Sequence, residues 1–232
     1  MANYPGFNNK IALEVLAQDI ALSIRQAQVY GISVRAANIA TEQAPPYGVH
    51  FVGAQTDNRS IIGDGARSFF FFADYNGDGM FWDKNGSPQY EGGTDLQGNC
   101  LPQTSAGGVG NGVVECVQGF TIKGQSAIGM ICRNLMSDTS KTMDVKLRDC
   151  FVNPISHADI VFRRPNPEAV ISGWFQLTGQ RETNLSDLDV FVRSTKGAAP
   201  DRMVVIWSTG QISVRTCNTV FSSANFATCN TL

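Results

Sequence analysis

The sequence predicts an α+β fold in which one long N-terminal helix packs on antiparallel β-sheets. Residues 8–38 have helical periodicity and contain no proline, whereas the chain from residue 47 onward contains many short apolar runs typical of strands. Pro45 and Pro46 separate the two parts because adjacent prolines cannot continue a helix. A helix followed by sheets is the α+β pattern. We expect one domain, with residues 1–40 as the helix and residues 41–232 as a β-rich head.

The expected helix has two apolar faces. At about 100° per residue, one stripe has the spacing of a face that docks on a core, and it consists of Leu13, Leu16, Ile20, Ile24, Ala27, Gly31 and Val34. A second stripe on nearly the opposite side consists of Ile11, Val15, Leu22 and Val29. A helix with two apolar faces needs two partners. Either both partners belong to its own domain, or the second face packs on neighbouring subunits.

Strands are expected wherever alternating or continuously apolar runs have strand length. These runs cover residues 47–52, 67–74, 112–122, 127–133, 142–147, 158–163, 170–177, 188–193, 203–207 and 211–216. Residues 208–210 (Ser-Thr-Gly) join the last two runs and predict a hairpin. Residues 84–112 form a long glycine-rich connection, and long connections of this kind are usually functional or held in place. A Cys100–Cys116 disulfide or a bound ion are two candidates for holding it.

Charge and cysteine content limit the function classes. The net charge is −2 and the 18 Lys+Arg residues do not cluster, which argues against nucleic acid or an anionic bilayer as the main partner. The chain has no apolar run of the roughly 18 residues that a membrane span needs. Six cysteines without a CxxC pair favour disulfides outside the cytoplasm over a metal site, although six buried thiols would give the same count.

Residues 74–83 resemble the first half of a calcium loop. Asp74, Asn76 and Asp78 place oxygen-bearing side chains at alternate positions, a glycine follows, and Met80 offers its carbonyl. The second half departs from the helix-loop-helix pattern, because a strand precedes the loop and position twelve is Asn85. Asp83, or an acidic residue of the following loop (Glu91 or Asp95), would have to complete the calcium site. The alternative is a hairpin turn rich in Asn and Asp that needs no metal.

We find no catalytic constellation in the sequence. His50 and His157 belong to no recognisable pattern of nucleophile and base, and we expect surface histidines. Ser156, His157 and Asp159 have the residue types of a triad, but neighbours on one strand point to opposite faces. Residues 107–112 (GGVGNG) lack the spacing of a nucleotide-binding loop. The sequence therefore does not predict an enzyme.

Four segments together resemble a known family. Residues 16–35 (LAQDIALSIRQAQVYGISVR) are similar to the amphipathic second half of a type IV pilin N-terminal helix. Residues 72–79 (FADYNGDG), 160–169 (IVFRRPNPEA) and 204–215 (VVIWSTGQISVR) are similar to segments of bacterial prepilin-like proteins of the GspH/FimT type, the minor pilins and pseudopilins. The similarity spans most of the chain. The peptidase site, the terminal glutamate and the apolar anchor helix of the family are missing, so we expect a head domain that lacks its anchor.

The resemblance implies a structural subunit of a type IV pilus, displayed at the cell surface after passage through the inner membrane, with other pilin subunits as partners. It implies that Ile11, Val15, Leu22 and Val29 face those subunits. It also places the family's C-terminal disulfide at Cys217 and Cys229. For the other four cysteines three pairings exist, and their order favours Cys100–Cys116 and Cys132–Cys150.

Two alternatives follow from the same resemblance. One is a DNA-binding uptake pilin, for which the C-terminal hairpin offers Arg202 and Arg215 but also Asp201. Phosphate binding normally needs several cations on one face, which makes this alternative the weaker one. The other is a calcium-dependent adhesin or a pseudopilin of a type II secretion system. The sequence does not separate a pilus from a secretion pseudopilus.

Overall fold

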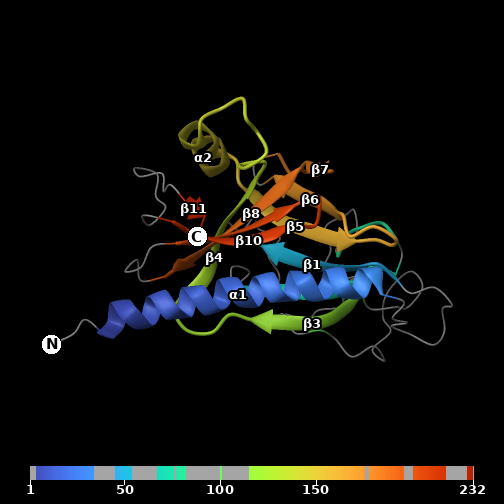
Figure 1. The fold of residues 1–232 in the computed structure, drawn as a ribbon, viewed down its shortest axis with the longest axis horizontal. Coiled ribbons are helices and arrows are strands. Elements are labelled where there is room, and N and C mark those ends of the chain that lie inside the picture. Colours follow the sequence, from blue (N-terminus) through green and yellow to red (C-terminus); the bar gives the residue numbers. More distant parts are fainter. Residues whose placement is uncertain are drawn as a thin grey trace.

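A long helix packed on two antiparallel sheets forms the fold (Figure 1). The computed structural model describes residues 4–33, 45–53, 67–75, 77–81, 100, 115–175, 178–195, 201–217 and 229–231. Helix α1 (Tyr4–Ile32) begins four residues before its expected start. Pro5 is compatible with that start because the first turn of a helix leaves its backbone N–H groups unpaired. The α+β class predicted from the sequence is therefore correct.

One sheet has six strands and is antiparallel at every pairing. Its order is β3 (Cys116–Thr121), β2 (Ser68–Ala73), β1 (Tyr47–Val52), β5 (Ile155–Phe162), β6 (Ala169–Phe175) and β7 (Arg181–Thr183). The four-phenylalanine run lies in β2, next to the outer strand β3, and all six residues of β2 are buried. A continuous apolar run is expected where both faces of a strand are covered.

The second sheet has five strands, in the order β11 (Cys229–Thr231), β10 (Ile212–Cys217), β9 (Arg202–Trp207), β8 (Asp187–Ser194) and β4 (Ser126–Arg133). The predicted hairpin joins β9 to β10, and Gly210 has a φ of +84° in its turn, a conformation that glycine adopts without strain. The sequence reading missed strands β7 and β11, which have only three residues each.

The main core lies between α1 and the inner faces of the two sheets. Successive strand residues point to opposite faces, so Phe69 and Phe71 join this core while Phe70 and Phe72 join a smaller cluster on the outer face. The buried side chains of α1 belong to the main core, and they are Leu13, Leu16, Ala17, Ile20, Ala21, Ile24 and Ala27. This set contains the docking stripe read from the sequence, except for Gly31, which is buried but has no side chain, and Val34, which lies outside the described residues.

Three contacts fix α1 on the sheets. Gly31 lies so close to β5 that a Cβ atom would sit 2.5 Å from the Phe162 carbonyl oxygen. The Gln28 side-chain amide donates hydrogen bonds to the carbonyls of Pro167 and Gly210, both at 3.1 Å. The Glu14 carboxylate pairs with Arg202 of β9 at 2.7 Å, and this pairing lowers the pKa of Glu14. The rotation of the helix about its axis is therefore set by contacts along most of its length.

The strand expected at residues 142–147 is wrong, because these residues begin helix α2 (Met143–Val152). Leu147 and Cys150 are buried and Met143 and Phe151 pack beside them, a helical spacing of three and four residues. Asp144 lies in the first turn, where a negative charge favours a helix. Helix α2 covers the outer face of the five-stranded sheet, on the side away from α1 (Figure 1).

Candidate functional site

The face of α1 turned away from the sheets carries a row of exposed apolar side chains. Phe7, Ile11, Val15, Leu22 and Val29 are between 47% and 63% exposed. At about 100° per residue, all five lie within roughly 80° of arc, opposite the buried stripe. They extend over about 33 Å of helix at 1.5 Å per residue. Phe7 was not singled out in the sequence, although its spacing of four residues from Ile11 was the signal that marks it.

An apolar groove adjoins this row of side chains. It has a volume of about 650 Å³ and lies between α1 and the end of β3 with the segment that follows it. Val15 and Leu22 line it from the helix, and Phe120 and Ile122 line it from the opposite side. Asp19 and Lys123 add one charge of each sign. The exposed face of α1 and the groove therefore form one continuous apolar surface.

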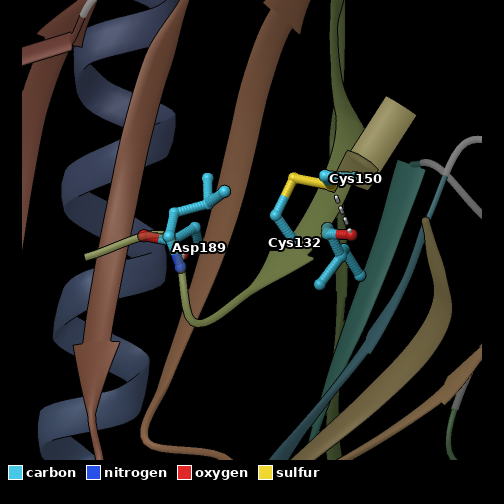
Figure 2. The surroundings of a disulfide bond; sticks show 5 residues. Cys132, Cys150 and Asp189 are labelled. Atoms are coloured by element: carbon cyan, nitrogen blue, oxygen red, sulfur yellow. Dashed lines mark hydrogen bonds between the residues drawn. A yellow bond between two sulfur atoms is a disulfide. The ribbon is translucent and has the colours of Figure 1, made fainter. Parts of the chain in front are cut away.

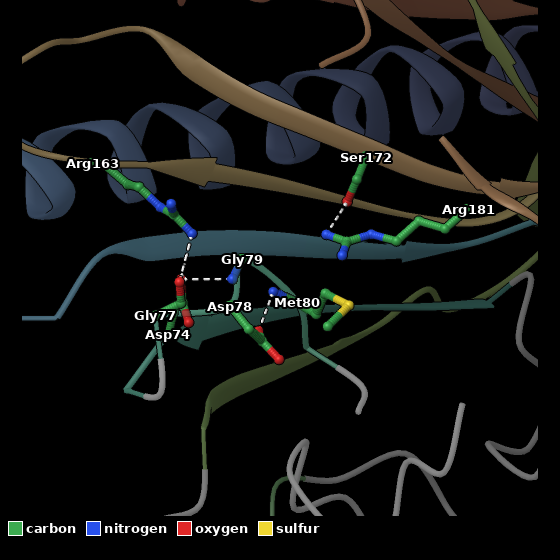
Figure 3. Close-up of polar contacts among 8 residues, drawn as sticks. All are labelled: Asp74, Gly77, Asp78, Gly79, Met80, Arg163, Ser172 and Arg181. Carbon is green, nitrogen blue, oxygen red and sulfur yellow. Dashed lines mark hydrogen bonds and ion pairs between the residues drawn. The ribbon is translucent and has the colours of Figure 1, made fainter. Parts of the chain in front are cut away.

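The loop after β2 is the second candidate site (Figure 3). Asp74 directly follows the strand and is only 1% exposed. Its Oδ2 accepts a hydrogen bond from the Gly79 N–H at 3.0 Å, and the Asp78 Oδ1 accepts one from the Met80 N–H at 2.8 Å. Gly77 and Gly79 both have a φ of +76°, which closes the loop tightly. The two carboxylates predicted to begin a calcium loop thus belong to one compact turn.

Arg163 contacts this turn, and nothing in the sequence indicated that contact. Its guanidinium lies 3.4 Å from the Asp74 Oδ2 and donates a hydrogen bond to the Gly77 carbonyl at 2.9 Å. Burial raises the pKa of Asp74, the guanidinium opposes this effect, and the nearby Asp78 adds to it. Arg163 lies 89 residues from Asp74 in the chain, so no local pattern could have paired them.

The remaining calcium ligands named from the sequence, Asn76 and Asp83, lie outside the described residues, as do Glu91 and Asp95. Within the described part of the chain, no three His, Cys, Asp or Glu side chains are grouped so that they could hold a metal ion. The turn therefore offers two carboxylates and backbone carbonyls. Calcium binding there stays a prediction.

The cysteines indicate an oxidising, extracytoplasmic location. Disulfides join Cys100 to Cys116 and Cys132 to Cys150, the pairs that their order favours. The second disulfide ties β4 to α2 beside Asp189 (Figure 2). Cys217 is also disulfide-bonded, and Cys229 lies opposite it in the β10–β11 ladder. Among the described residues, no helix is apolar over enough of its length to cross a membrane.

The two histidines are buried, which corrects the expectation of surface histidines. His50 is fully buried, and its Nδ1 lies 2.7 Å from the Oδ1 of Asp159, which is also fully buried. His157 stacks on Trp174 at 4.5 Å between ring centroids. The Ser156 hydroxyl lies 3.1 Å from the Nδ1 of its neighbour His157, at an irregularity in the β5–β6 register. Asp159, however, pairs with the other histidine. The structure thus brings Ser156 and His157 together without assembling a triad.

The arginines of the C-terminal hairpin are used within the fold. Arg202 is 8% exposed and pairs with Glu14 of α1. Arg215 contacts the Met136 sulfur at 3.5 Å and lies 5.7 Å from the centre of the Trp207 ring. Asp201 beside them is fully buried. These two arginines do not present the cationic face that phosphate binding needs.

No protein-family model, curated protein sequence or solved structure matches this chain.

Proposed function

We propose that this protein is a structural subunit of a type IV pilus or a related filament, without catalytic activity, and that α1 is its assembly element. One face of α1 holds the head and the other packs on neighbouring subunits. The single observation that carries the proposal is the row of exposed apolar side chains, Phe7, Ile11, Val15, Leu22 and Val29, along the face opposite the buried stripe. Scattered apolar residues on a surface are ordinary, but a continuous apolar patch usually marks an interaction site.

The size of the patch fits a repeated contact between subunits. Burying a Leu, Ile, Val or Phe side chain completely is worth about 1.5–3 kcal/mol, so the exposed half of each contributes about 1 kcal/mol. Five such residues together contribute about 5 kcal/mol, before the cost of association is subtracted. A single contact of this strength gives only weak binding. A filament overcomes this limit because each subunit contacts several neighbours at once. The charge of −2 and the internal pairing of Arg202 support this role over DNA capture.

The disulfides agree with use outside the cytoplasm, where pili function. A pseudopilin of a type II secretion system would use the same helix face, so the proposal covers both kinds of filament. What separates them is the filament in which the chain is found.

The test is crosslinking in the cells that make this protein. A photoreactive amino acid at Leu22 is expected to form covalent adducts with pilin-type subunits in the sheared filament fraction. The same amino acid at Val152 is the matched control, because Val152 is 63% exposed but lies at the end of α2. A Leu22→Asp variant is expected to fold normally and to be lost from filaments, whereas Val152→Asp is retained. Normal incorporation of Leu22→Asp, or a chain absent from every filament, would refute the proposal.

A further inference from the structure

The position of Asp74 is fixed by the sheet that precedes it. Asp74 is the first residue after β2, and its backbone N–H donates to the Pro46 carbonyl at 2.9 Å, just before β1. The loop therefore starts from a strand held on both sides, by β1 and by β3. A carboxylate in such a place is oriented before any ligand arrives, which favours binding.

The turn then brings a second carboxylate back to the first. The Gly79 N–H hydrogen bond to the Asp74 Oδ2 joins residues five positions apart, and Asp78 lies immediately before that glycine. In calcium loops the first and fifth positions supply carboxylate oxygens, the sixth is a glycine in a sharp turn, and the seventh supplies its backbone carbonyl. Asp74, Asp78, Gly79 and Met80 occupy these positions. This likeness alone would not distinguish a cation site from an ordinary tight turn.

A second observation concerns the other oxygen of Asp74. The Oδ1 atom is buried, the residue being only 1% exposed, and it has no hydrogen-bond partner among the residues that the structure describes. Leaving a buried carboxylate oxygen without a partner costs free energy. A cation beside Oδ1 would remove this cost and would also offset the repulsion between Asp74 and Asp78.

Arg163 does not fill this role, because its guanidinium approaches the Oδ2 atom and the Gly77 carbonyl (Figure 3). Its side chain is 41% exposed, so it can turn toward solvent when a stronger cation binds. The arginine is thus a partial counter-ion that keeps the turn closed without a metal. Its positive charge also weakens binding of any second cation, which predicts a site of modest affinity.

We propose that the turn after β2 is a calcium site, formed by the Asp74 Oδ1, the Asp78 carboxylate and the backbone carbonyl of Met80. Calcium fits better than magnesium because it accepts irregular sets of carboxylate and carbonyl oxygens, whereas magnesium demands near-octahedral geometry. Asn76 and Asp83 lie outside the described residues, and the proposal does not depend on them. With few ligands and a nearby guanidinium, we expect a Kd of about 10⁻⁴–10⁻³ M, the range of extracellular calcium modules. The site is independent of the proposed filament role.

The test uses the intact chain and calcium itself. Isothermal titration should give saturable binding of one calcium ion per chain, and magnesium should bind more weakly. About 10 mM calcium should raise Tm by about 5 °C relative to a chelator, because ligands that bind the native state stabilise it. Absence of both the heat of binding and the Tm shift would show that Arg163 alone serves as the counter-ion, and the proposal would fail.

Variants locate the ion. Asp74→Asn and Asp78→Asn should each weaken calcium binding by more than about 10-fold, since even the hydrogen-bonded neighbours of metal ligands have effects of that size. Asp138→Asn is the matched control, because Asp138 accepts the same type of hydrogen bond, from the Ser140 N–H at 2.8 Å, in an exposed turn. This control should bind calcium normally. Arg163→Gln should bind more tightly. Unchanged affinity in both Asp74→Asn and Asp78→Asn would place the ion elsewhere and overturn the proposal.

Discussion

Replacing Ile24 and Leu22 separately by alanine distinguishes the two faces of α1. The two residues lie two positions apart on the same helix, and the change removes a branched side chain of the same size from each. Ile24 is fully buried in the main core, whereas Leu22 is 58% exposed. If the fold uses only one face of the helix, the two substitutions must have very different effects on stability.

The magnitudes follow from burial. Truncating a buried isoleucine to alanine costs about 2–5 kcal/mol, because the removed atoms lose their contacts and leave a cavity. A loss of about 3 kcal/mol lowers Tm by about 6–12 °C in a domain of this size. Leu22→Ala should change stability by less than about 0.5 kcal/mol, because the site is exposed and alanine favours a helix at least as well as leucine.

The assay is thermal and urea unfolding followed by circular dichroism, with the helix signal recorded before unfolding. Filament incorporation should show the opposite ranking of the two variants. Leu22→Ala should weaken incorporation directly, whereas Ile24→Ala should affect it only through the lower stability of the fold. Equal losses of stability from both substitutions would mean that the outer face of α1 is also covered within the monomer. That result would remove the basis for an assembly face.

Three further predictions concern buried groups. Burial raises the pKa of Asp189 well above its ordinary value, with Asp187 adding to the effect, so the native state binds a proton that the unfolded state releases. The free energy of unfolding should therefore fall as pH rises from the unfolded pKa of about 4 through the raised native pKa. Urea unfolding between about pH 4 and 8 should show this fall in the unmutated protein and not in Asp189→Asn. Asp159→Ala should cost about 3 kcal/mol, because it leaves His50 buried without its carboxylate; a loss under about 1 kcal/mol in the same assay would contradict this. Replacing Cys132 and Cys150 together by alanine should lower the free energy of unfolding by about 3 kcal/mol for a loop of this length, and an unchanged urea midpoint would argue against the bridge as a stabilising link.

The parts of the fold that local patterns determine could be read from the sequence. The buried face of α1 was predictable because its apolar residues recur with helical spacing over several turns. Most strands were predictable because β-branched and aromatic runs of strand length leave few alternatives. Helix α2 was not, since its first residues contain Met143 and Val145 in a strand-like alternation. Its buried positions become clear only from contacts with β4 and β8.

The candidate sites also differ in how far local sequence patterns could predict them. The exposed row on α1 could be read from the sequence, because a second apolar stripe is visible whether or not a partner is present. The contact of Arg163 with Asp74 and the His50–Asp159 pair could not be read from the sequence. Their partners lie 89 and 109 residues apart in the chain. The surroundings of Asp74 are set by those distant strands and by the packing of β2 between its neighbours. Composition and spacing therefore suggested calcium chemistry, whereas only the folded chain shows that the Asp74 Oδ1 is buried without a partner among the described residues.

Strand β2 connects the two candidate sites and also keeps them apart. Phe69, near its beginning, lines the groove beside α1, whereas Asp74 follows its last residue. Five residues of extended strand separate them by about 17 Å at 3.4 Å per residue. Substitutions at sites more than about 10 Å apart usually have additive effects. Calcium should therefore stabilise the head equally in the free chain and in an assembled filament, and contacts along α1 should form whether or not the Asp74 turn holds an ion.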